Sequence, residues 1–190
     1  MKRIIIAVIA VLMSITAFSQ EHMKFKGIEI NGTTAEFAQK LTTVGFKIVD
    51  KSDNIYALEG VFSGNEATLY VYPNSKGIAN RVVVMYDVKD LSWKIIKSRY
   101  ENLENGLITK YGKPQKSVKH MDIVYKDGSG YEVMGFQMEK NEYNTSWLIE
   151  GVGGIGLMFQ STHQIPSCIL LFYQDALNSV EDEQQAYDDL

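Results

Sequence analysis

Residues 90–112 carry the strongest helical pattern in this chain, and strand-like segments lie on both sides of them. The apolar side chains recur at i, i+4, i+7, i+11 and i+15, which is one face of a helix with 3.6 residues per turn. They are Ile96, Tyr100, Leu103, Leu107 and Tyr111, with Trp93 and Ile108 beside that line. The charged residues, Glu104 among them, lie mostly off this stripe. One long amphipathic helix therefore needs a sheet to cover its apolar face.

The two ends of this helix are marked by residues that cap helices. Asp90 has a side chain that accepts hydrogen bonds from free backbone N–H groups, so it is the expected N-cap. Gly112 favours a left-handed stop, and Pro114 prevents the helix from continuing.

The first 19 residues have the pattern of a secretory signal peptide. Lys2 and Arg3 precede an uncharged apolar run over residues 4–15, and Ala17 and Ser19 stand at the −3 and −1 positions of a cleavage site. The run is shorter than the roughly 20 residues that a membrane-spanning helix needs. We therefore expect export to the periplasm or the medium, a mature chain from Gln20 or Glu21, and no membrane span in that chain.

Charge argues against nucleic acid as a partner. The formal net charge is −4, and it becomes −6 when Lys2 and Arg3 are removed. No Lys or Arg follows Lys140, whereas binding to phosphates needs clustered basic residues.

Few residues in this sequence point to catalysis, a cofactor or a metal. Cys168 is the single cysteine and lies in an apolar segment, so we expect a buried and inert thiol. His22, His120 and His163 have no neighbours at metal-ligand spacing and are expected to face solvent. Residues 151–156 match G-x-G-x-x-G, but a strand-like segment follows them where a dinucleotide site needs a helix, so a turn between strands is the expected structure. We expect no metal site, no cofactor and no local catalytic motif, although a carboxylate pair can still be assembled by the fold from remote strands.

The remaining segments repeat one order of elements. Thr33 and Glu36 fit a capping box at the start of a first helix. Strand-like segments follow from Phe46 and at residues 55–62, 66–72 and 79–86, and after the central helix at residues 117–125, 131–140, 147–150, 155–160 and 167–174. We predict an α+β fold in which two tandem helix-plus-four-strand units form an antiparallel sheet with the helices on one face. The single domain spans residues 20–178, with halves at 25–89 and 90–178.

The best candidate binding residues are tyrosines on one predicted strand. Tyr70 and Tyr72 share a face with Thr68, and the alternate residues Leu69 and Val71 share the other. The aliphatic face suits the helices, so the tyrosines are expected on the opposite side of the sheet. Exposed tyrosines suit binding surfaces, while cross-strand pairing that stiffens the sheet is the other interpretation.

Residues 179–190 form an acidic C-terminal helix or tail in this interpretation. Ser179 and Asp182 suit a short helix, and the segment is either solvated or a docking segment for a basic partner.

Several stretches together resemble a group of uncharacterised exported proteins of Bacteroidetes. They are the signal ending at residues 17–20, the opening at residues 25–33 with its continuation at 37–41 and 45–46, and the ending at residues 171–178. The order of elements also resembles the beta-lactamase-inhibitor-protein-like fold, which binds proteins across a concave sheet. These resemblances imply no inhibitory residue and no activity that can be carried over to this chain.

Together these patterns predict an exported, non-enzymatic binding or scaffolding protein that uses a sheet face to bind a protein or glycan in the envelope. An envelope-assembly accessory, or a hydrolase whose carboxylates meet only in the fold, is the alternative.

Overall fold

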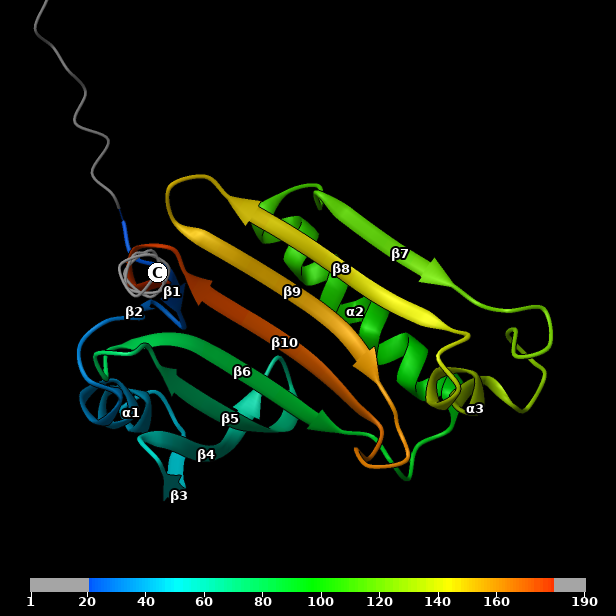
Figure 1. The fold of residues 1–190 in the computed structure, drawn as a ribbon, viewed down its shortest axis with the longest axis horizontal. Helices are drawn as coiled ribbons and strands as arrows, with labels where there is room; N and C mark the ends of the chain where they lie inside the picture. Colours follow the sequence, from blue (N-terminus) through cyan, green and yellow to red (C-terminus); the bar gives the residue numbers. More distant parts are fainter. Residues whose placement is uncertain (1–20, 180–190) are drawn as a thin grey trace, which may run out of the picture.

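The computed structural model describes residues 21–179. An antiparallel sheet of eight strands has the order β3-β4-β5-β6-β10-β9-β8-β7, and β1 and β2 form a separate pair (Figure 1). The strands are β1 (Lys24–Phe25), β2 (Ile28–Glu29), β3 (Lys47–Ser52), β4 (Ile55–Phe62), β5 (Asn65–Pro73), β6 (Ala79–Asp87), β7 (Lys116–His120), β8 (Glu142–Ile149), β9 (Gly153–Gln160) and β10 (Cys168–Asp175). The helices are α1 (Thr34–Thr42), α2 (Trp93–Tyr111) and α3 (Glu132–Gln137). The predicted signal peptide and the acidic segment from residue 180 lie outside the described residues.

The sheet joins two sets of strands at its centre. Strands β3 to β6 pair in sequence order, strands β7 to β10 do the same, and the last strand of each set meets the other. Strand β6 pairs with β10 from Asp87↔Cys168 to Arg81↔Gln174. Every strand pair is antiparallel, so the predicted α+β class with an antiparallel sheet is confirmed.

Helix α1 begins where the capping box was predicted. The Thr33 hydroxyl accepts a hydrogen bond from the Glu36 backbone N–H at 3.2 Å, and the Glu36 carboxylate accepts one from the Thr33 N–H at 2.9 Å. The bond from the Thr33 N–H is the larger cause that lowers the pKa of Glu36, and the Thr33 hydroxyl, which donates to the same carboxylate at 3.0 Å, is the next. Two N–H groups that a helix leaves free are thereby satisfied.

Helix α2 ends as predicted but begins later than predicted. Gly112 has a φ of 82° and donates its N–H to Ile108 O, so it is the left-handed stop. The N-cap is Ser92, without a side-chain cap bond, and not Asp90. A turn closed by Leu91 N–H to Val88 O occupies the residues before it, so the helix starts only after this turn.

The apolar stripe of α2 faces the core, as predicted, and Trp93, Ile96, Tyr100, Leu103 and Leu107 are buried. Tyr111 is half-buried and Ile108 is exposed. Helix α1 packs over β3, β4 and β5, and α2 packs over β8 and β9. The short β1–β2 pair adds Phe25, whose ring contacts Phe46, Phe62 and Tyr173. In Figure 1 α2 lies behind β8 and β9, so the viewer looks onto the face that α2 does not cover.

One predicted strand is a helix. Residues 131–140 were expected to be extended, because Met134, Phe136 and Met138 alternate, but α3 occupies Glu132–Gln137. Of these three alternating side chains only Phe136 is buried, and its ring contacts Trp93, Tyr143 and Phe159. The alternation was misleading because a segment that buries a single ring can do so from one helical turn as well as from a strand.

Close packing holds α3 in place. The Asn141 side chain donates to Tyr125 O and Glu132 O at 3.1 and 3.0 Å. A Cβ on Gly135 would lie 2.3 Å from Asn141 Nδ2, so only glycine fits there. Strand β7 accordingly ends at His120, short of the predicted residue 125. Strand β8 begins at Glu142, ahead of the predicted residue 147.

The glycine-rich run is a turn, as expected. Residues 150–152 connect β8 to β9, and Gly153 opens β9 beside Asp175 of β10, so the later glycines of the run lie within that strand. A Cβ on Gly153 would lie 2.0 Å from Gln174 O, so the close approach of two strands requires glycine. Because a strand follows the glycines, no helix N-terminus stands there to bind a dinucleotide pyrophosphate.

None of the helices within residues 21–179 is long and apolar enough to span a membrane.

Candidate functional site

The two candidate tyrosines lie on the sheet face that α1 and α2 do not cover. Leu69 and Val71 are fully buried on the helix side, while Tyr70 and Tyr72 point to the other side and are half-buried. The irregularity in β5 falls after Tyr72, so the alternation holds through both rings. We call the side away from the helices the open face.

The neighbours of Tyr70 on the open face come from three other strands. Tyr70 lies opposite Val83 of β6, Val83 opposite Phe172 of β10, and Phe172 opposite Gly156 of β9. The Phe172 ring lies 3.4 Å from the place where a Cβ of Gly156 would stand, so the missing side chain makes room for the ring. Tyr70 is thus one end of an apolar row across four strands.

A second row runs beside the first. Thr68 lies opposite Met85 of β6, Met85 opposite Leu170 of β10, and Leu170 opposite Met158 of β9. The side chains of both rows are half-buried, except Val83, which is buried. We call these two rows the apolar strip, which consists of Tyr70, Val83, Phe172, Thr68, Met85, Leu170 and Met158. Antiparallel sheets with one solvated face usually alternate apolar and polar residues, and this face departs from that rule.

Polar groups border the apolar strip. The Arg81 guanidinium donates to the Gln174 side chain at 2.5 Å, one step beyond the Val83–Phe172 pair. On the other side an open hollow of about 530 Å³ is bordered by Glu59, Glu66 and Asp87, with Lys47. This margin therefore carries more acid than base.

The pKa values at this margin have identifiable causes. Partial burial raises the pKa of Tyr70, with Tyr72, Asp50 and Glu59 adding to it, so the phenol stays neutral and can donate a hydrogen bond. The backbone N–H of Lys89 lowers the pKa of Asp87, which remains a carboxylate.

A buried polar cluster under α2 was missed from the sequence. Glu104 was placed off the apolar stripe, yet it is 6% exposed. It accepts hydrogen bonds from Lys119 Nζ at 2.5 Å, Thr145 Oγ1 at 2.9 Å and Ser117 Oγ at 3.3 Å. Tyr100 joins through Thr145. Each polar atom has a partner, so this cluster ties α2 to β7 and β8.

His22 does not face solvent freely, contrary to the expectation for the histidines. Its Nδ1 lies 3.2 Å from the Asp175 carboxylate, and its Nε2 lies 2.8 Å from Asn31 Nδ2. Asp175 also accepts from the Met23 and Asn178 backbone N–H groups. These bonds fasten the start of the described chain to the end of β10. His120 and His163 are exposed, as expected.

Cys168 is buried and unpaired, as expected. Burial raises its pKa to about 11, with a smaller contribution from Asp87, so little nucleophilic thiolate forms at neutral pH. Within residues 21–179, no group of three or more His, Cys, Asp and Glu side chains is placed to hold a metal ion.

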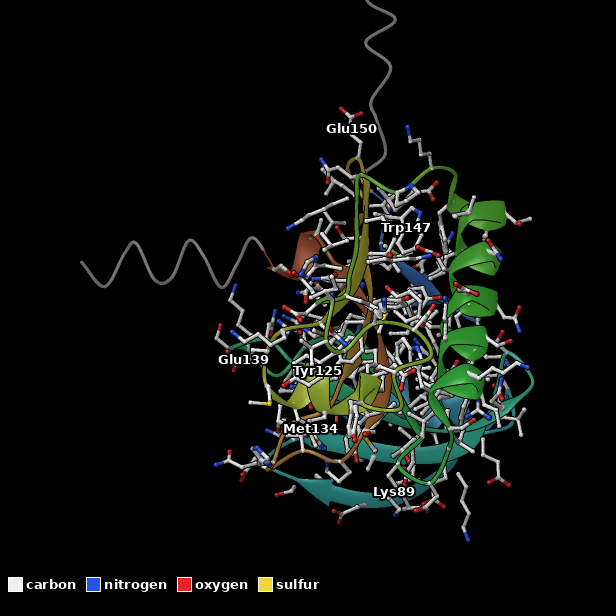
Figure 2. The ribbon with its side chains drawn as sticks, turned by 90° about the vertical axis from the view of Figure 1, so that its right-hand side faces the viewer. Lys89, Tyr125, Met134, Glu139, Trp147 and Glu150 are labelled. Carbon is white, nitrogen blue, oxygen red and sulfur yellow. The ribbon has the colours of Figure 1, made fainter. Side chains whose placement is uncertain are left out.

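A second exposed apolar region lies on the segment around α3. Its large apolar side chains are exposed by 45–78%, and they are Ile123, Val124, Tyr131, Met134 and Met138. In Figure 2 Met134 and Glu139 lie at the margin of the molecule away from α2. The side chains of this region stand apart from the apolar strip in sequence, since none belongs to β5, β6, β9 or β10.

The structure thus places Tyr70 and Tyr72 on one face, as predicted. It also brings side chains of β6, β9 and β10 beside them, which were not singled out from the sequence. A usable signal existed, because residues 79–86 and 167–174 are apolar at both parities, which indicates strands with two apolar faces.

No protein-family model, curated protein or solved structure matches this chain. The resemblances stated from the sequence therefore remain expectations.

Proposed function

We propose that this protein is an exported, non-enzymatic binding protein that holds a protein partner against the apolar strip. The observation that carries the proposal is the apolar strip itself, which crosses four strands on the face that α1 and α2 do not cover. Exposed contiguous apolar surface, bordered by polar groups, marks interaction sites in soluble proteins. Export rests on the signal-peptide pattern of residues 1–19.

The partner's chemistry follows from the border of the strip. Glu59, Glu66 and Asp87 lie along one margin, and Tyr72 lies beside Tyr70 of the strip on the same face. A protein surface with apolar side chains in its centre and Lys or Arg at its rim would complement both. Tyrosine gives large contact area at a small cost in rotamer entropy, which suits such a contact.

The order of elements supports a further part of the proposal. We propose that the two strand sets are tandem helix-plus-four-strand units, since α1 precedes β3 to β6 and α2 precedes β7 to β10. The sheet order, in which β6 and β10 meet at the centre, agrees with this arrangement. It also fits the resemblance to the beta-lactamase-inhibitor-protein-like fold and its sheet-face binding. A role as an envelope-assembly accessory would use the same surface.

The hydrolase alternative finds less support. The three carboxylates of the open hollow are its best candidates, but a general acid needs a raised pKa and that of Asp87 is lowered. The pKa of Asp127, which lies elsewhere, is also lowered, first by its hydrogen bond from Lys97 and then by that from Trp93.

The test compares tyrosines on and off the open face. Tyr70→Ala and Tyr72→Ala are combined, and Tyr131→Ala serves as the control, because Tyr131 is 58% exposed on the α3 segment. Each variant is used to capture partners from an envelope extract, and the affinity for the captured protein is then measured. We expect the double variant to lose at least about 30-fold in affinity, since a single interface tyrosine often contributes about 2 kcal/mol.

The control should retain its partner, and all variants should melt within a few degrees of the parent. Retained affinity in the double variant would remove the open face from the proposal. A large drop in melting temperature would show that the two rings belong to the core.

A further inference from the structure

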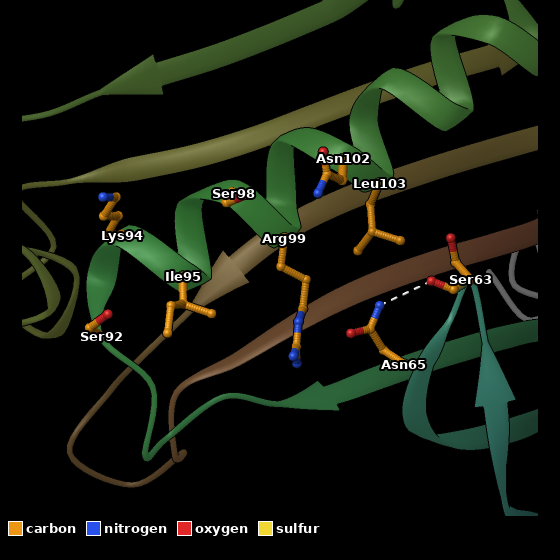
Figure 3. A pocket seen from close by; sticks show the side chains of 9 residues that line it. All are labelled: Ser63, Asn65, Ser92, Lys94, Ile95, Ser98, Arg99, Asn102 and Leu103. Atoms are coloured by element: carbon orange, nitrogen blue, oxygen red, sulfur yellow. Dashed lines mark hydrogen bonds between the residues drawn. The ribbon is translucent and has the colours of Figure 1, made fainter.

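The helix side of the molecule contains a polar groove that is separate from the open face. It lies between α2 and the turn that joins β4 to β5, and its volume is about 630 Å³ (Figure 3). In Figure 3 Ile95, Arg99 and Leu103 extend from α2 toward this turn, and Ser63 and Asn65 stand across from them. The complete lining is Ser63, Asn65, Ser92, Lys94, Ile95, Ser98, Arg99, Asn102 and Leu103.

The charge of this groove differs from that of the chain. Its lining contains Arg99 and Lys94 and no carboxylate, in a protein with a net charge of −4. Arg99 is half-buried, and its guanidinium makes no hydrogen bond or ion pair with any residue from 21 to 179. The other arginine in that part of the chain, Arg81, donates to Gln174. Arg99 therefore keeps its full set of N–H donors for a ligand.

Amide and hydroxyl groups surround this guanidinium. Asn65 donates one N–H to Ser63 O at 3.0 Å, which fixes the amide across the groove and leaves its oxygen available. The side chains of Asn102 and Ser98 make no hydrogen bond to another described residue. Ile95 and Leu103 add apolar surface beside them, with Ile95 49% exposed and Leu103 6% exposed. The groove thus combines one strong anion-binding group, several neutral hydrogen-bonding groups and an apolar wall.

Acidic residues lie on the far side of Arg99. A neighbouring hollow of about 450 Å³ is bordered by Glu66, Asp87 and Asp90 as well as Arg99. None of these three carboxylates is bonded to Arg99. Asp87 is instead engaged by Lys89, through Nζ at 3.1 Å and the backbone N–H at 3.0 Å. These carboxylates repel an anion from the neighbouring hollow. An anionic group would therefore meet Arg99 from the groove, whose lining has no carboxylate.

We propose that this groove binds an acidic sugar, meaning a small polyhydroxylated ligand with a carboxylate or phosphate group. The guanidinium of Arg99 would hold the anionic group through paired N–H bonds, which is the geometry for which arginine is suited. Asn65, Asn102 and Ser98 would bond the hydroxyls, and the Ile95–Leu103 wall would contact the C–H face of the ring. The groove and the apolar strip lie on opposite sides of the sheet, so this proposal does not depend on the proposed function.

The test uses D-glucuronate and D-glucose 6-phosphate as probes, with D-glucose as the neutral comparison. Binding is followed by chemical shifts of the side-chain amides of Asn65 and Asn102 and of Arg99 Nε–H in the full mature protein. We expect at least one acidic probe to bind, with glucose at least tenfold weaker. The affinity should fall as NaCl is raised from about 0.05 to 0.5 M, because added salt screens exposed charges.

Two variants locate the site. Arg99→Gln should weaken the acidic probe at least about tenfold, since hydrogen bonds to charged groups are the stronger class. Arg81→Gln makes the same chemical change on the open face and should leave binding unchanged. Arg99→Lys keeps the charge without the planar fork and should bind with intermediate strength. If thermal unfolding shows that Arg99→Gln does not fold, Arg99→Lys still measures how much the affinity depends on the guanidinium.

The possible results distinguish a carboxylate ligand, a phosphate ligand and the absence of a site. Binding of glucuronate alone assigns a carboxylate ligand, and binding of glucose 6-phosphate alone assigns a phosphate ligand. No binding of either acid to the parent protein overturns the proposal. Equal binding to the parent and Arg99→Gln, or loss of binding in Arg81→Gln, also overturns it. The Tyr70→Ala, Tyr72→Ala double variant should bind the probes normally, so failure of the proposed function would leave this result standing.

Discussion

The two faces of the eight-stranded sheet are built from the same strands and carry different kinds of side chain. One row on the core face runs Leu58, Leu69, Val84, Leu171 and Leu157, and these residues are at most 1% exposed. The matching row on the open face runs Ala57, Tyr70, Val83, Phe172 and Gly156. Aliphatic residues of similar size fill the first row, while the second mixes rings with residues that have small side chains or none.

This difference distinguishes side chains that pack the core from side chains that are presented on the surface. A core is filled by branched aliphatic side chains at high density, and α1 and α2 supply the other half of that packing. On the open face Phe172 rests over Gly156, so its ring is supported by the sheet itself. Such a ring is held in place without being covered, which lowers the entropy lost when a partner binds.

The strongest test of the comparison is a pair of neighbours on β5. Leu69→Ala removes a fully buried side chain from the core face and should cost about 2–5 kcal/mol of unfolding free energy. Tyr70→Ala, one residue away on the open face, should cost roughly 1 kcal/mol or less, the scale of a cross-strand pair. Urea denaturation measures both changes. Equal costs for the two variants would show that the open face is packed as tightly as the core.

The polar cluster under α2 tests a place where a carboxylate is buried on the core face. Glu104→Ala removes the acceptor for Lys119, Thr145 and Ser117, and we expect a loss of about 1–3 kcal/mol. Glu101→Ala, one turn earlier on α2, is the matched control and should change stability by less than about 0.5 kcal/mol. If the two variants unfold at the same urea concentration, Glu104 is not a structural tie.

The parts of the fold that follow local rules were predictable from the sequence. The capping box of Thr33 and Glu36, the stop at Gly112 and the face assignment of Leu69 and Tyr70 each depend on residues within a few positions. Helix α3 was not predicted because the position of Phe136 depends on contacts with Trp93, Tyr143 and Phe159, which belong to other elements. Long-range packing overrode the local alternation there.

The candidate site was predictable only in part, for a similar reason. The sequence indicates that Tyr70 points away from the helices, but its neighbours depend on the register of β6, β10 and β9. The partners in the β6–β10 pair, such as Val83 and Phe172, are far apart in sequence, so their pairing leaves no trace in a local pattern. The Arg99 groove likewise requires α2 and the β4–β5 turn to be placed side by side.

The smallest change in unfolding free energy is expected on the solvent side of α2. This change is a baseline for the variants on the open face. Lys97 Nζ pairs with the Asp127 carboxylate, whose side chain is 48% exposed. Exposed ion pairs typically contribute between 0 and 1 kcal/mol, so Lys97→Ala should cost about 0.5 kcal/mol. Lys94→Ala is the control, because Lys94 is exposed and has no ion pair within the described chain; it should cost less.

The pH dependence of this small effect identifies its source. The hydrogen bond from Lys97 is the main cause that lowers the pKa of Asp127, and the same bond raises the pKa of Lys97. A lowered carboxyl pKa contributes stability above the unfolded value of about 3.9, and this contribution is lost as pH falls through the folded value. A raised lysine pKa contributes stability below the unfolded value of about 10.4, and it is lost as pH rises through the folded value. The difference between the parent and Lys97→Ala should therefore be constant from about pH 5 to 9 and shrink toward zero in acid. A difference that persists at pH 2 would mean that the lysine stem contributes by packing and not by its charge.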